Sequence, residues 1–227
     1  MLVLAFDTAT AAVAVALYEW VPGEGVRARA VAEGVEERRH TEVLTPAVAG
    51  VLAEAGAVPA ELSAVVVGVG PGPYTGLRVG LVTARALGDA LRIPVHGVCT
   101  LDAIAWGSGR DAPFAVATDA RRKEVYWARY ASRGVRVTGP HVGPAADVLD
   151  GAPDLPVIGE GATLYPDVLG TSQLGAEPLL PSASALAELA IARLSGKKGP
   201  ALLPPEPLYL RRPDAVAPGP RKKVTPA

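Results

Sequence analysis

The sequence predicts an α/β protein built from two related lobes, and two observations support this fold class. Apolar runs at 2–6 and 114–118 each end at an aspartate, Asp7 and Asp119, and a pair of strand-like segments follows each run. Segments with helical periodicity come next, so strands and helices alternate along the chain. The repeated opening favours duplicated lobes, although alternation alone would also fit one open, doubly wound sheet.

In the first half, apolar runs and changes of periodicity mark the elements in order. Strands are expected at 2–6, 12–17, 64–69 and 94–98, with a weaker one at 28–32, and helices at 41–55, at 75–91 and from about residue 101. The helix at 41–55 contains Pro46, which implies a kink or a late start.

The second half repeats the pattern with shorter signals. Strands are expected at 114–118, 124–131, 135–138 and 155–158, and Ser182 should cap a helix that reaches about residue 194. The stretch 196–207 is rich in Pro, Gly and Lys and should be irregular. These patterns divide the chain into lobes at 1–110 and 111–212, with a disordered tail at 213–227 that lacks apolar periodicity.

Composition favours a globular protein of the reducing cytoplasm. Hydrophobic residues make up 49% of the 227 residues, which is enough for a sizeable core. The net charge of −1 gives no reason to expect general adhesion to nucleic acid or membrane. The single cysteine, Cys99, cannot form an intrachain disulfide, and the apolar N-terminus has no basic leader.

The most specific motif is the segment GPGPYTGLRVG at 70–80. It closely resembles the G-P-G-x-[FY]-T-G-L-R-x-G segment of the TsaB family, the dimerisation subunits of the bacterial complexes that make threonylcarbamoyladenosine in tRNA. Matching stretches occur in the same order over almost the whole chain up to Arg212; they are DTAT at 7–10, RHTE at 39–42, DARR at 119–122, EVY at 124–126, GEGA at 159–162 and YLR at 209–211.

This resemblance implies an actin-like, sugar-kinase-like fold of two lobes, each built on a related five-stranded sheet. It also implies a non-catalytic scaffold that binds the catalytic subunit TsaD, alongside the ATPase TsaE, and that pairs with itself when TsaD is absent. Contact with tRNA would then be indirect, through the complex. A freestanding small-molecule kinase or ATPase of the same fold is the alternative.

The nucleotide turns of this fold bear on that alternative. ATP-binding members carry an Asp-x-Gly-x-[ST] turn in each lobe, whose glycine lets backbone amides approach the phosphates. Here Asp7, Thr8 and Thr10 remain in the first turn but Ala9 replaces the glycine. In the second turn Asp119 is followed by Arg121 at the glycine position. We therefore expect ATP or ADP to bind only weakly, or at a subunit interface.

No metal site is expected. The resemblance aligns Thr100 and Ile104 with two histidines that bind the ion in the catalytic relative, and neither residue supplies an imidazole. The three histidines, His40, His96 and His141, share no helical spacing.

The helix at 75–91 carries a stripe of small residues, Gly76, Gly80, Ala84 and Gly88, spaced four apart. Three glycines are costly inside a helix, so another backbone should approach closely. One interpretation is a subunit interface; the other is tight packing of this helix on its own sheet. The residues expected at the interface are Gly76, Leu77, Arg78, Val79, Gly80 and Ala84, with His40 contributing a polar contact.

Overall fold

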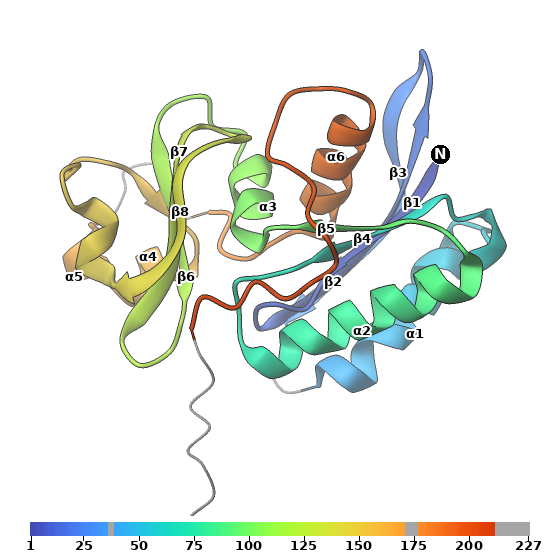
Figure 1. Cartoon of the computed structure of the whole chain (residues 1–227), viewed down its shortest axis with the longest axis horizontal. Helices are drawn as coiled ribbons and strands as arrows, with labels where there is room; N and C mark the ends of the chain where they lie inside the picture. Colours follow the sequence, from blue (N-terminus) through green and yellow to red (C-terminus); the bar gives the residue numbers. More distant parts are fainter. Residues whose placement is uncertain (36–38, 171–176, 212–227) are drawn as a thin grey trace, which may run out of the picture.

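The computed structural model describes residues 1–35, 39–170 and 177–211. Its first sheet has the strand order β3-β2-β1-β4-β5 (Figure 1). The strands β1 (Leu2–Asp7), β2 (Ala12–Val21) and β3 (Gly25–Val35) pair antiparallel, whereas β4 (Ala64–Gly68) and β5 (Val95–Val98) run parallel to β1. The expected strand pair after Asp7 is therefore present, and longer than the apolar runs alone indicated.

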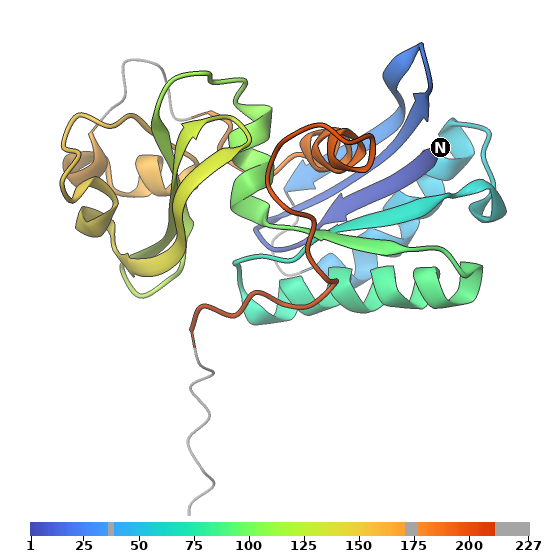
Figure 2. The same ribbon diagram turned by 45° about the horizontal axis from the view of Figure 1, so that its top comes forward.

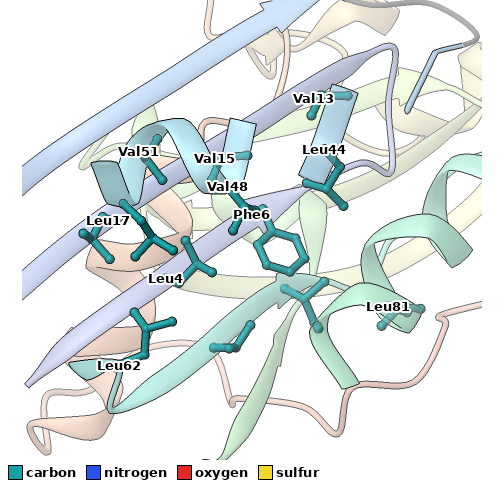
Figure 3. Close-up of a cluster of buried hydrophobic side chains, with 14 of the residues drawn as sticks. Leu4, Phe6, Val13, Val15, Leu17, Leu44, Val48, Val51, Leu62 and Leu81 are labelled. Atoms are coloured by element: carbon teal, nitrogen blue, oxygen red, sulfur yellow. The ribbon is translucent and has the colours of Figure 1, made fainter. Parts of the chain in front are cut away.

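Helices cover both faces of this sheet. The helices α1 (His40–Glu54) and α2 (Tyr74–Leu91) lie on one face, and α6 (Ala183–Leu194) lies on the other (Figure 1). Alternate residues of β1 serve the two layers: Leu4 and Phe6 point to α1 and α2, and Val3 and Ala5 to α6. Figure 3 shows the first of these cores. A strand buried on both faces explains the continuous apolar run.

Pro46 does not delay the start of α1. The helix begins at His40 and includes Pro46, whose side chain is exposed. Of the two outcomes expected from Pro46, a kink or a late start, the late start is therefore wrong.

The second sheet has four strands among the described residues, in the order β8-β7-β6-β9. Antiparallel β6 (Phe114–Asp119), β7 (Glu124–Ser132) and β8 (Val135–Pro144) repeat the β1-β2-β3 arrangement, and β9 (Val157–Ile158) repeats β4. Two short 3₁₀ helices, η1 (Pro59–Glu61) and η2 (Ala145–Leu149), precede β4 and β9.

The resemblance implies a fifth strand in this sheet, which the described residues do not form. The segment around Leu179 lies beside the end of β9 but does not pair with it as a strand. The Leu179 carbonyl accepts one hydrogen bond, from Glu160 N at 3.0 Å. Pro178 and Pro181 flank that position and lack amide donors, which opposes continued pairing.

The layers of the two lobes interlock. The helix α3 (Thr100–Gly107) follows β5 but packs against β6, β7 and α6, so it lies between the two sheets (Figure 2). The helices α4 (Glu160–Leu164) and α5 (Pro166–Leu169) cover the far face of the second sheet. No helix in the described part of the chain is long and apolar enough to span a membrane.

After α6 the chain crosses back over both lobes. Residues 202–211, which we call the C-terminal strap, run between α2 and the second lobe (Figure 1, red). Within this irregular stretch Leu203 forms an isolated bridge with Gly97. The predicted disordered tail at 213–227 lies outside the described residues.

Candidate functional site

The turn after β1 is occupied by contacts within the chain. Asp7 is fully buried and accepts hydrogen bonds from Ala9 N at 2.6 Å and from Thr100 Oγ1 at 2.8 Å. Burial raises the pKa of the Asp7 carboxyl, opposed by these two hydrogen bonds. Both carboxylate oxygens thus hold the local structure together.

The two threonines of this turn are also engaged. Thr8 Oγ1 donates to Gly76 O at 2.8 Å and accepts from Gly80 N at 3.0 Å, which ties the turn to α2. Thr10 Oγ1 accepts from Ala12 N at 3.3 Å. The hydroxyl groups that would hydrogen-bond a phosphate therefore already have partners in this chain.

The motif GPGPYTG explains how α2 comes so close to this turn. A Cβ atom on Gly72 would overlap the carbonyl oxygen of Ala9, and one on Gly76 would overlap that of Thr8. Glycine is required at both positions because backbone meets backbone there. The start of α2 consequently covers the turn that binds phosphate in nucleotide-binding members of the fold.

The second turn is a strained hairpin between β6 and β7. Arg121, Arg122 and Lys123 have φ of 60°, 57° and 62°, the left-handed region that non-glycine residues rarely enter. Asp119 stabilises the hairpin, since its carboxylate accepts from Arg121 N at 2.7 Å and pairs with the Arg121 guanidinium at 3.0 Å. Asp119 is thus committed to its own turn.

One hollow between the two turns is small. The hollow there is lined by Ala9, Thr10, Gly72, Asp119 and Arg121, among others, and its volume is about 40 Å³. Sites for small molecules usually measure roughly 300–1,000 Å³. This hollow lies below that range, whereas two neighbouring hollows of about 480 and 490 Å³, both lined in part by Arg121, fall within it.

The positions aligned with metal-binding histidines serve the core. Thr100 is buried and bonds Asp7, and Ile104 packs against the second sheet with Phe114. Among the described residues, no group of three or more His, Cys, Asp or Glu side chains is arranged to hold a metal ion.

The small-residue stripe faces inward, as the second interpretation, tight packing on its own sheet, expects. Gly76, Leu77, Gly80 and Ala84 are all buried in the isolated chain. A Cβ on Gly80 would lie 2.6 Å from Thr8 Oγ1 and 3.5 Å from Val67 Cγ2. The close backbone partner is the turn after β1 and its sheet, so these four residues pack within this chain.

The opposite face of α2 is exposed, and only two of the residues expected at an interface lie on it. Tyr74, Arg78 and Val82 follow at i, i+4 and i+8, and Val82 is 66% exposed. With α1 they border an open groove of about 500 Å³, lined also by Thr41, Leu44, Thr45, Thr75, Val79 and Thr83. We call this the α1–α2 outer face. Arg78 and Val79 from the expected interface do lie on it.

The strap adds an aromatic residue beside this face. Tyr209 stacks on Tyr74 with ring centroids 5.4 Å apart, and Arg78 lies over the Tyr74 ring at 3.8 Å while its Nε donates to Tyr209 Oη at 3.0 Å. Because Tyr209 is 131 residues from Arg78 in sequence, no local pattern could have identified this cluster.

His40 links α1 to the turn after β1. Its Nε2 lies 2.8 Å from Thr10 O. The ring also lines a hollow of about 480 Å³ with Thr10, Thr41, Thr75 and Arg121, which opens next to the outer face. His40 is therefore a packing residue of α1 at the edge of the groove.

Comparisons with known proteins agree with this geometry. Residues 31–169 match the family model described as TsaD, tRNA N6-adenosine threonylcarbamoyltransferase. The Escherichia coli tRNA threonylcarbamoyladenosine biosynthesis protein TsaB is 34% identical, and the alignment covers 93% of this chain and 95% of that protein. An uncharacterized protein of Mycobacterium tuberculosis is 48% identical, with 94% and 93% covered.

A solved structure gives the same result. YeaZ from Pseudomonas aeruginosa superposes with a TM-score of 0.76 at 32% identity, covering 92% of this chain and 99% of that one. Full-length sequence similarity and structural similarity thus coincide. The chain belongs to the TsaB family, and its two mixed sheets flanked by helices form the actin-like, sugar-kinase-like fold.

Proposed function

We propose that this chain is an accessory subunit of tRNA threonylcarbamoyladenosine synthesis that binds the catalytic subunit TsaD through the α1–α2 outer face. The names of its TsaB relatives support the pathway. The observation that carries the docking role is the exposed groove between α1 and α2, with Tyr74, Arg78 and Val82 along it. Tyrosine and arginine beside apolar surface are typical of the residues that dominate protein interfaces.

The match to the TsaD family model supports the choice of partner. A chain whose fold resembles that of its partner can use one helix pair for both self-pairing and hetero-pairing, because equivalent faces meet about a two-fold axis. A homodimer formed through this face would therefore compete with the complex. TsaE and tRNA would join through the assembled complex rather than through this chain alone.

The same structure weighs against a freestanding kinase or ATPase. Thr8 and Asp7 use their oxygens within the chain, and the hollow between the turns holds about 40 Å³. The larger hollow at His40 and Arg121 is open beside the outer face, so a partner could complete a nucleotide site there. The chain by itself should have no catalytic activity.

Reconstitution tests the proposal. The chain, TsaD and TsaE from one organism are mixed with ATP, threonine, bicarbonate, the enzyme that makes the threonylcarbamoyl donor, and unmodified tRNA, and threonylcarbamoyladenosine is measured in digested tRNA. We expect product in the full mixture, none without this chain and none from this chain alone. Equal product without the chain would refute the accessory role. Turnover of ATP by the purified chain would favour the kinase or ATPase alternative.

A further inference from the structure

The junction between the two lobes carries contacts that the proposed function does not use. Lobes joined through a modest interface usually move relative to one another. Here α3 follows the first sheet in sequence and packs on the second, so its first turn lies where such movement would occur (Figure 2).

A buried ionic cluster joins α3 to the second sheet. Asp102 on α3 is 2% exposed; its Oδ1 accepts from Tyr130 Oη at 2.9 Å and lies 3.3 Å from Arg136 Nη1. Tyr130 belongs to β7 and Arg136 to β8. Burial raises the pKa of Asp102 and the Arg136 charge opposes that rise. A carboxylate this deep needs its cation and its hydroxyl donor, so separating α3 from the second sheet would break both contacts.

The same turn of α3 is fastened to the first lobe. Thr100, two residues before Asp102, donates from Oγ1 to Asp7 and accepts from Gly70 N at 3.2 Å. One helical turn therefore holds polar contacts to both lobes.

The C-terminal strap supplies a second fastening. Leu203 exchanges two backbone hydrogen bonds with Gly97, at 2.7 and 2.8 Å, and Leu208 N donates to Val69 O at 2.8 Å in the first lobe. Further on, Arg211 donates to Ala120 O at 3.2 Å and forms an ion pair with Glu124, both on the second lobe. The strap thus bridges the lobes on the side of α2.

We propose that the Asp102–Tyr130–Arg136 cluster and the C-terminal strap lock the two lobes at one angle. The chain is then a rigid frame whose cleft neither opens nor closes around a ligand. A rigid frame keeps the α1–α2 outer face in a single arrangement relative to the second lobe, which lowers the entropy lost on docking. The lock is a property of the isolated chain and does not depend on the proposed partner.

The distance between the lobes can be measured directly. Spin labels are attached to Ala49→Cys on α1 and Asp167→Cys on α5, both exposed positions, and their distance distribution is recorded by pulsed electron resonance. The native Cys99 should not react, because burial raises the pKa of its thiol to about 12. The distribution is recorded with and without Mg-ATP, in the parent, in Arg136→Met, in the double variant Asp102→Asn/Arg136→Met, and in the control Arg27→Met.

We expect a narrow distribution in the parent that Mg-ATP does not move. Arg136→Met should broaden it, because the cation that holds Asp102 to β8 is gone. The double variant should be at least as broad, because it lacks both ends of that contact. Arg27 is exposed and pairs with Glu19 within the first lobe at 2.7 Å, so Arg27→Met should match the parent. A broad parent distribution, a shift with Mg-ATP, or a folded Arg136→Met as narrow as the parent would overturn the proposal.

Thermal melting establishes first that each variant is folded. Should Arg136→Met fail to fold, Tyr130→Phe takes its place, since it removes one hydroxyl and keeps the ring stacked on Phe114 at 5.3 Å. A Tyr130→Phe distribution identical to that of the parent would then contradict the lock.

Discussion

At the scale of single residues, the space between α2 and the turn after β1 decides which side chains are allowed. Asp7 and the glycines of α2 could be singled out from the sequence as a turn and a close approach. What approaches them could not, because Thr8 and Gly80 are 72 residues apart. The spacing indicates that one face of the helix must carry small side chains. Only the tertiary structure shows what packs against that face.

Gly80→Leu should destabilise the isolated chain. The new side chain would meet Thr8 Oγ1 and Val67, and overpacking of a filled core costs about 1–3 kcal/mol. Urea unfolding measures this loss, with Ala86→Leu on the exposed side of α2 as the matched control. If the Gly80→Leu chain is as stable as the parent but no longer self-associates, the small-residue stripe forms a subunit interface instead.

ATP binding should not return when the two turn glycines are restored. In Ala9→Gly/Arg121→Gly the crowding side chains are gone, yet Gly72 still packs on residue 9 and the Thr8 hydroxyl still bonds Gly76 and Gly80. Calorimetry of the parent and this double variant with Mg-ATP should show no binding in the micromolar range. Micromolar affinity in the double variant would mean that side chains alone block the site.

His96 should make stability depend on pH. Burial lowers the pKa of His96 from its ordinary 6.5, so just below that pH the unfolded chain binds more protons than the folded one. The contribution to stability is complete above pH 6.5 and is lost as the pH falls through the lowered pKa. The melting temperature of His96→Gln should therefore fall less steeply than that of the parent on acidification. Parallel pH profiles would contradict this.

At the scale of elements, the apolar runs predicted which segments form strands, and the structure confirms them. The strand β8 was underestimated because Gly139, Pro140 and Gly143 interrupt its pattern, although pairing with β7 continues to Pro144. The sequence left open which face of α2 meets a partner, because a glycine stripe and an exposed apolar stripe are both typical of interfaces. Burial against the sheet distinguishes them.

Ser182→Ala should weaken α6, the helix that covers the first sheet opposite α2. The Ser182 hydroxyl accepts from Ser184 N at 3.1 Å and from Ala185 N at 3.4 Å, which confirms the predicted cap. Loss of such a cap costs about 1 kcal/mol. Denaturant unfolding should show that loss, and Ser184→Ala, within the same turn, should cost less. Equal stability of parent and Ser182→Ala would contradict the role of the cap.

At the scale of the whole molecule, the duplicated design was predictable because both halves open with the same strand pattern and Asp. The interlocking of the lobes was not. Neither α3 crossing to the second sheet nor α6 returning to the first leaves a local signal, since each helix is simply apolar on the faces that it buries. The strap was expected to be irregular; its bridge between lobes depends on backbone contacts such as that of Leu203 with Gly97.

The central claim is that the α1–α2 outer face binds the catalytic subunit, and one comparison tests it most directly. Val82→Asp places a charge on that face, and Val137→Asp makes the same change on β8 of the other lobe. The two valines are almost equally exposed, Val82 to 66% and Val137 to 67%. Affinity for TsaD is measured by sedimentation or calorimetry for the parent and both variants. We predict that both variants keep the melting temperature of the parent. Val82→Asp should lose at least about tenfold in affinity for TsaD, which corresponds to roughly 1.4 kcal/mol. Val137→Asp should bind TsaD with the affinity of the parent. Parent affinity in a folded Val82→Asp would contradict the claim.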